Sequence, residues 1–250
     1  MLGGEGIMEK SATKDMTVGS PFRLIVQFFV PLFLGMLFQQ FYSMMDTIIV
    51  GKALGVHALA AVGATGSINF MIIGFCMGVC SGFAIPVAQR FGAGDYRALR
   101  KYVANSVWLS VAFAGVMTLV VCLLCKNILV WMRTPEDIFS DAYIYIFVIF
   151  AGIPATYLYN LLSGIIRSLG DSKSPLLFLV FSSLLNIALD LIFILAFSMG
   201  VAGAALATVI AQAVSGILCL FYMKKKFTIL KIQKEEWKPE KSYMRYLCNM

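Results

Sequence analysis

Charged side chains are scarce in this chain. They make up 13% of its 250 residues, whereas hydrophobic residues make up 60% and the mean hydropathy is +0.86. Soluble domains carry about 25% charged residues, so the composition excludes an ordinary soluble globular domain. Metal-ligating residues are also few, with one histidine, His57, and a single C-x-x-C pair at Cys122 and Cys125. Since no second pair or neighbouring histidine completes a site, we interpret the cysteines as packing residues.

Long runs without charge predict six membrane spans. A helix needs roughly 20 apolar residues to cross about 30 Å of hydrocarbon. The last run, 174–223, is too long for one helix, and Ser198, Gly200 and Gly203 mark a turn that divides it at 198–201. The predicted spans are 24–50, 58–89, 102–125, 142–166, 175–197 and 202–223.

The basic residues predict the orientation of these spans. An even number of spans puts both termini on one side, and cytoplasmic loops keep the positive charge. With both termini inside, only Lys52, Lys126 and Arg133 of the 20 basic residues lie outside. We therefore expect a multi-pass plasma-membrane protein with cytoplasmic termini, whose charge of +7 meets anionic lipid headgroups and not nucleic acid. Its expected parts are a polar cytoplasmic lead-in over 1–20, a six-helix transmembrane lobe over 21–223 and a basic cytoplasmic linker over 224–250.

Asp46 and Asp190 are the only charged residues inside the predicted spans. An ionisable group at membrane depth is costly, and it usually marks an ion pathway, a proton relay or a buried partner. Helical spacing places further polar side chains on the same faces as these carboxylates. The polar set comprises Gln39, Tyr42, Ser43 and Asp46 in the first span, Asn186 and Asp190 in the fifth, and Thr208 and Gln212 in the sixth.

If these three faces meet, two carboxylates share a site of low dielectric constant with an amide and a hydroxyl. Like charges there cannot both stay ionised unless something offsets them. Either one carboxyl holds a proton, or a hard cation such as Na⁺ lies among the oxygens. We interpret the set as an ion switch. The alternative is that each aspartate only hydrogen-bonds across helices, or that Asp46 is solvated near the outer interface.

Pro31 lies in the first span and removes one backbone hydrogen bond from that helix. A helix that can bend at a proline and also carries Asp46 is a plausible moving part. We therefore predict a hinge at Pro31.

Several separated segments resemble the multidrug and toxic compound extrusion (MATE) transporters, in the family's order. They are 31–35 (PLFLG), 39–51 (QQFYSMMDTIIVG), 58–63 (ALAAVG), 89–95 (QRFGAGD), 167–171 (RSLGD), 186–190 (NIALD) and 203–208 (GAALAT). The similarity extends over about residues 16–223. It implies an all-α polytopic membrane fold in which six transmembrane helices form one lobe of a MATE-like (MOP-type) transporter.

The resemblance implies a transporter and not an enzyme. Its expected activity is antiport that exports amphipathic, often cationic, organic molecules in exchange for H⁺ or Na⁺, with no other cofactor. The family's N-terminal lobe carries a cation site, and the positions here that match it are Asp46, Asn186, Asp190 and Thr208. Beside the substrate cavity the resemblance places Gln39, Tyr42, Ser43 and Gln212.

The family has two six-helix lobes, whereas this chain has one lobe and a basic linker. A substrate path needs walls on both sides. We expect a truncated half-length chain, and a parallel homodimer is the alternative, because two copies with cytoplasmic termini insert in the same orientation.

Three other functions are compared with export. A lipid-linked oligosaccharide flippase of a related fold would be expected to carry several Arg or Lys residues in its cavity, and no cationic residue lies inside a predicted span. A non-transporting membrane scaffold remains open. The segment 92–95 (GAGD) matches the G-x-G-D pattern of intramembrane aspartyl proteases, but Asp95 follows the end of its helix, so we reject that dyad.

Overall fold

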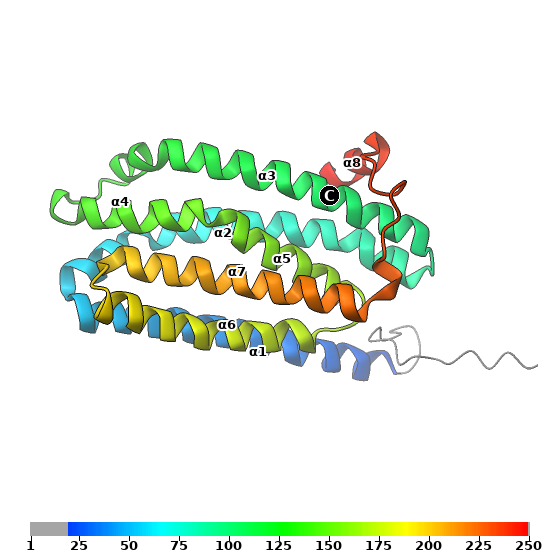
Figure 1. Ribbon diagram of the computed structural model, residues 1–250, viewed down its shortest axis with the longest axis horizontal. Coiled ribbons are helices and arrows are strands. Elements are labelled where there is room, and N and C mark those ends of the chain that lie inside the picture. Colours follow the sequence, from blue (N-terminus) through cyan, green and yellow to red (C-terminus); the bar gives the residue numbers. More distant parts are fainter. Residues whose placement is uncertain (1–19, 250) are drawn as a thin grey trace, which may run out of the picture.

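Each apolar run predicted to span the membrane forms a helix or a bent pair of helices, as Figure 1 shows. The structure is a computed structural model, and it describes residues 20–249. Within that range the elements are helical and no strand occurs. The elements of the bundle are α1 (Pro21–Leu54), α2 (Val56–Gly92), α3 (Tyr96–Trp131), α4 (Glu136–Ala151), α5 (Ile153–Ser168), α6 (Lys173–Leu191), the π-helical segment η1 (Ile192–Ala196) and α7 (Gly200–Lys226).

The predicted all-α fold with six spans is confirmed, with one change in the fourth. Five helices are each long and apolar enough to cross a membrane, and α4 with α5 forms the sixth span, bent by 44°. The predicted span over 142–166 thus consists of parts of two helices. The bend lies at Gly152, just before Pro154, where a residue without a side chain and a residue without an N–H weaken the helix.

The predicted turn within the last apolar run is confirmed. Ser198 and Gly200 adopt left-handed backbone conformations, with φ of 52° and 58°. Glycine reaches this region without strain, and α7 begins at Gly200. The π-helical segment η1 follows α6 directly and ends that helix before the turn.

Small residues let α7 pack closely against its neighbours. At Gly152 an added Cβ would lie 2.2 Å from Val209 Cγ2, so α7 approaches the bend between α4 and α5. Between α6 and α7, Ser182 Oγ donates to the carbonyl of Ala211 at 2.8 Å. The core therefore sits between α2, α4, α5, α6 and α7, while α1 packs along α6 and leaves much of its surface exposed.

We call the end of the bundle where α1, α3 and α6 begin the basic end, which lies at the right in Figure 1. Since the helices alternate in direction, α2, α5 and α7 end there. Basic residues gather at this end, among them Arg90, Arg100, Arg167, Lys173 and Lys224.

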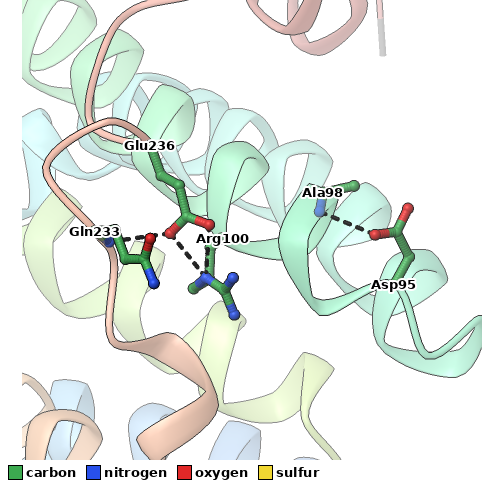
Figure 2. A network of polar contacts seen from close by, with 5 residues as sticks. All are labelled: Asp95, Ala98, Arg100, Gln233 and Glu236. Atoms are coloured by element: carbon green, nitrogen blue, oxygen red, sulfur yellow. Dashed lines mark hydrogen bonds and ion pairs between the residues drawn. The ribbon is translucent and has the colours of Figure 1, made fainter.

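The segment after α7 folds back onto α3 at the basic end. It contains η2 (Thr228–Leu230) and α8 (Lys241–Cys248). Figure 2 shows the main ion pair, in which Arg100 Nε donates to the two carboxylate oxygens of Glu236 at 2.8 and 2.9 Å. Trp108 Nε1 donates to the carbonyl of Trp237 at 2.9 Å, and Lys101 pairs with Glu240. The part of the predicted linker that the structure describes is thus ordered against α3.

The boundaries predicted for the polar lead-in cannot be compared with the structure, because residues 1–19 lie outside the described residues. The first described residue, Ser20, directly precedes α1.

Candidate functional site

A cavity of about 1570 Å³ is lined mainly by α1, α2 and α5, with single turns of α4, α6 and α7 completing it. The polar face predicted for the first span borders this cavity. The predicted residues that line it are Pro31, Gln39, Tyr42, Ser43, Asp46, Thr208 and Gln212. Asn186 and Asp190 lie behind this wall, since neither of them lines the cavity.

The two carboxylates meet between α1 and the last turn of α6. Asp46 is 7% exposed and Asp190 is fully buried. Their carboxyl groups are close enough to share a hydrogen bond. An ionised carboxylate can only accept hydrogen bonds. If both groups are ionised, Asp46 Oδ1 and both oxygens of Asp190 have no donor among the described residues.

Asn186 and Thr208 join α6 to α7 beside this pair. Asn186 Nδ2 donates to Thr208 Oγ1 at 3.3 Å. Asn186 Oδ1 is buried without a donor in the described part of the chain, and so is Gln212 Oε1. A small hollow of about 10 Å³ borders Asn186, Thr208, Gln212 and Tyr42. This is about the volume that one water molecule needs.

Five buried oxygens, from Asp46, Asp190, Asn186 and Gln212, lack a donor among residues 20–249. Burying such oxygens costs free energy unless a proton or a cation satisfies them. Carboxylate, amide and hydroxyl oxygens are ligands that a hard cation such as Na⁺ accepts, and a proton shared by the carboxyls meets the same need. No three His, Cys, Asp or Glu side chains of residues 20–249 lie together as a metal site would require.

Tyr145 is a cavity residue that the sequence reasoning missed. It lies on α4, is 6% exposed and lines the cavity within electrostatic range of Asp46, Asp190 and Tyr42. The predicted fourth span, 142–166, contains no charge, so no polar stripe on it indicated that this face turns toward the carboxylates.

Arg167 is the second cavity residue that the sequence reasoning missed. It lies in the last turn of α5 and lines the cavity. The predicted fourth span ends at 166, one residue before Arg167, so the prediction that no cationic residue lies inside a span did not exclude a cation from the cavity. Asp46 and Arg167 are the only two charged residues that line the cavity within the described chain.

Asp95, from the rejected protease pattern, has a structural role. Its Oδ1 accepts a hydrogen bond of 3.1 Å from the backbone N–H of Ala98, as Figure 2 shows, and it thereby caps the N-terminus of α3. Its other carboxylate oxygen lies 3.9 Å from Arg90 Nη1. Aspartate is among the preferred residues at this position, so helix capping accounts for Asp95.

Comparison with known proteins gives consistent matches. The family model MatE matches residues 31–192. The chain is similar to the probable multidrug resistance protein YpnP of Bacillus subtilis (strain 168), with 31% identity over 226 residues that cover 89% of this chain and 51% of the relative. The probable multidrug resistance protein YoeA of the same strain is 30% identical over 234 residues, which are 92% of this chain and 50% of the relative.

The fold is similar to that of solved transporters. One is the outward-facing conformation of a multidrug resistance MATE family transporter of the MOP superfamily, with a TM-score of 0.85 and 28% identity over 93% of this chain and 51% of that chain. The chain thus spans about half the length of the relatives it matches.

Proposed function

The chain belongs to the MatE family, and from this premise we propose that it forms the ion-coupled lobe of an antiporter that exports amphipathic organic cations in exchange for H⁺ or Na⁺. One observation carries the proposal. Two carboxylates from different helices, Asp46 and Asp190, meet at the wall of a large cavity inside a membrane-spanning bundle. A cationic cargo and a coupling ion can compete for this negative charge.

The geometry suggests how such competition would be coupled to movement. Asp46 belongs to α1, which is packed along α6 and is otherwise largely exposed, whereas Asp190 belongs to the core helix α6. A proton or Na⁺ between the carboxyls offsets their repulsion and holds α1 against α6. Loss of the ion restores the repulsion and favours displacement of α1, with Pro31 as the place where it bends.

The available driving force is sufficient for export. One charge that moves down 100 mV supplies about 2.3 kcal/mol, and one unit of pH gradient supplies about 1.4 kcal/mol. A hundredfold gradient of cargo requires about 2.8 kcal/mol. Exchange of one coupling ion for one monovalent cation moves no net charge, so the membrane potential does not contribute and one unit of pH gradient sustains only about a tenfold gradient of cargo. Two coupling ions for each exported cation supply about 5 kcal/mol, which is enough.

A complete pathway needs a wall opposite α1 and α2. We propose that a second six-helix lobe supplies this wall. We also propose that the chain lies in the plasma membrane with its basic end on the cytoplasmic side. A second copy of this chain in parallel orientation is one source of that lobe. The bundle begins with α1 and ends with α7. The start of α1 and the end of α7 both lie at the basic end, as this arrangement requires.

One observation favours the flippase alternative, namely Arg167 in the cavity wall. A pyrophosphate carries several negative charges, and a cavity built for it would be expected to offer several cations. Arg167 is the only cation that lines this cavity among the described residues. Asp46, which would repel a pyrophosphate, lines the same space, so export of cationic cargo is favoured.

The test measures ethidium efflux from proteoliposomes that contain the full chain. Efflux is followed under an imposed pH gradient, an imposed Na⁺ gradient and no gradient. We expect one gradient to drive efflux, and Asp46→Asn and Asp190→Asn each to abolish it while membrane insertion is kept. Asp137→Asn is the matched control, because this aspartate is 62% exposed and lies outside the cavity.

Two further readouts separate the alternatives. Movement of a fluorescent anionic lipid without ethidium efflux would favour the flippase. Ethidium binding to the chain in nanodiscs is measured as well, because binding does not need a second wall. If ethidium neither binds nor moves, or if both Asn variants behave as the unmodified chain does, the antiporter proposal fails.

A further inference from the structure

Arg167 is a cation in the cavity wall that pairs with no acidic side chain of residues 20–249. It lies near the basic end of the bundle, in the last turn of α5, and is only partly exposed. At 1.5 Å per residue, the 22 residues that separate it from Tyr145 place it about 30 Å along the span from the carboxylates. Arg167 therefore forms a site of its own, separate from the cation site.

The guanidinium is held in place but remains largely free to bind. Arg167 Nη2 donates to Ser163 Oγ at 3.1 Å, and Ser163 Oγ in turn donates to the carbonyl of Asn160 at 3.1 Å. A guanidinium has five N–H donors. The bond to Ser163 is its only hydrogen bond in the described part of the chain, where it makes no ion pair.

The nearest acid in the sequence is already used. Asp171 Oδ1 accepts from the backbone N–H groups of Lys173 and Ser174 at 3.1 and 3.0 Å, which caps the start of α6. Its Oδ2 accepts from Ser174 Oγ at 2.6 Å and from Tyr222 OH at 2.8 Å. These four bonds occupy both carboxylate oxygens, and Asp171 forms no ion pair with Arg167 among the described residues. A partly buried cation without a counter-charge is costly, and residues 20–249 supply none, so a bound anion is the expected partner.

An apolar wall adjoins this end of the cavity. Ser168 Oγ donates to the carbonyl of Ala84 at 2.9 Å, which fixes the end of α5 against α2. Ile85 and Ala88 line the cavity within about one helical turn of that contact. An anionic group at Arg167 can therefore carry an alkyl or aromatic tail that lies along α2.

We propose that Arg167 forms an anion-binding subsite at the basic end of the cavity, and that it takes the phosphate or carboxylate group of an amphipathic molecule. Arginine is suited to this role, because its planar donors match the oxygens of carboxylate and phosphate groups in pairs. The same chemistry is supplied by a free amphipathic anion or by the headgroup of an anionic lipid. The subsite goes beyond the proposed cation exchange and does not depend on it.

The test uses the full chain in nanodiscs of phosphatidylcholine, with decyl phosphate as the probe and calorimetry as the readout. Arg167→Gln is expected to weaken decyl phosphate binding about tenfold or more, as loss of a charge-assisted hydrogen bond would. Arg167→Lys keeps the charge without the paired donors, so intermediate binding is expected. Decyltrimethylammonium should bind Arg167→Gln and the unmodified chain equally well.

Arg97→Gln is the matched control. It removes the same charge at the same end of the bundle, but Arg97 is exposed and does not line the cavity. Unchanged decyl phosphate binding in Arg97→Gln supports the subsite, whereas equal weakening in both Gln variants would show a general surface effect and overturn it. Unchanged binding in Arg167→Gln also overturns it. If Arg167→Gln does not fold, as judged by circular dichroism, unchanged binding in Arg167→Lys contradicts the role of the paired donors.

A second arm identifies the source of the anion. Native mass spectrometry compares lipid retained by the chain after extraction from membranes that contain phosphatidylglycerol. If the unmodified chain retains phosphatidylglycerol and Arg167→Gln does not, the anion is a lipid headgroup. If both retain it equally while Arg167→Gln binds decyl phosphate more weakly, the anion is a free amphipathic molecule. Asp46→Asn should leave decyl phosphate binding intact, so failure of the exporter proposal remains distinguishable from failure of this one.

Discussion

Asn186 on α6 and Thr208 on α7 are joined by a hydrogen bond of 3.3 Å in which the amide donates to the hydroxyl. Asn186 is 1% exposed, so this donor has no access to solvent. Thr208→Val keeps the shape of the side chain and removes the acceptor. Leaving a buried donor unpaired costs about 1–3 kcal/mol, and we expect a loss of that size in the free energy of unfolding, measured by denaturant titration in detergent.

Thr118→Val is the control for this prediction. Thr118 Oγ1 is also buried, but it has no hydrogen-bond partner within the described residues. Removing an unpaired hydroxyl relieves a cost, so the variant should be as stable as the unmodified chain or more stable. If Thr208→Val and Thr118→Val lower the free energy of unfolding equally, the hydrogen bond between Asn186 and Thr208 does not account for the effect.

The contact between Gly152 and Val209 predicts a second stability effect. A Cβ at position 152 would lie 2.2 Å from Val209 Cγ2 and 2.8 Å from Cγ1. Valine is stiff about χ1 and cannot move these methyl groups aside cheaply. Gly152→Ala should therefore lower the free energy of unfolding by about 1–3 kcal/mol, as overpacking in cores does, and should lower the melting temperature in detergent.

Gly78→Ala is the matched substitution on α2. No atom lies within 4 Å of the added Cβ there. Alanine also favours helix over glycine, so the melting temperature should stay constant or rise. A fall as large as that of Gly152→Ala would contradict a role for close approach of α7 at the bend.

The ion pair between Arg100 and Glu236 predicts that docking of the segment after α7 depends on pH. The hydrogen bonds from Arg100 lower the pKa of Glu236 below its ordinary value of 4.5. A carboxyl whose folded pKa is lowered stabilises the docked state above the ordinary pKa, and this stabilisation is lost as the pH falls through the lowered value. We expect the segment to stay docked at pH 7 and at pH 5, and to detach at a midpoint below 4.5.

Trp108 and Trp237 report this detachment, because the indole N–H of Trp108 donates to the backbone carbonyl of Trp237 in the docked state. Fluorescence is followed with Trp131→Phe as background. Glu236→Gln should weaken docking at pH 7 and remove the acid transition, whereas Glu235→Gln, at an exposed neighbour, should change neither. A midpoint at or above the ordinary glutamate pKa would contradict the role of Arg100.

The sequence predicted the spans because the hydrocarbon core imposes a minimum length of apolar residues on any helix that crosses it. The turn before α7 was predictable for a similar reason, since Gly200 reaches a left-handed conformation that most residues avoid. The polar set was predictable as one face of each helix. That Asp46, Asp190, Asn186 and Thr208 lie together is a tertiary fact, which the structure supplies.

Other features depend on contacts between helices that are distant in the sequence. Pro154 indicates a weak point, but the 44° bend accompanies the close approach of Val209 to Gly152. Arg167 resembled a loop residue because a charge ended the apolar run, whereas α5 continues to Ser168. Tyr145 carried no sign of its role because the predicted span that contains it, 142–166, has no charged residue. Local pattern thus predicts the elements, and packing decides which side chains face the cavity.

Pro31 provides the last prediction, on the moving part of the proposed antiporter. α1 runs without a break through Pro31, which is buried and lines the cavity. Proline lacks the N–H that would complete the helix, so Pro31→Ala should stiffen α1 and keep or raise its thermal stability. We expect ion-driven ethidium efflux to fall at least tenfold while ethidium binding in nanodiscs is retained. Pro86→Ala, at a buried proline inside α2, should leave efflux within twofold. Equal efflux in Pro31→Ala and Pro86→Ala would exclude the hinge. A proline that only packs within its helix is expected to affect transport to the same extent at either position, whereas a hinge at Pro31 affects transport at that position alone.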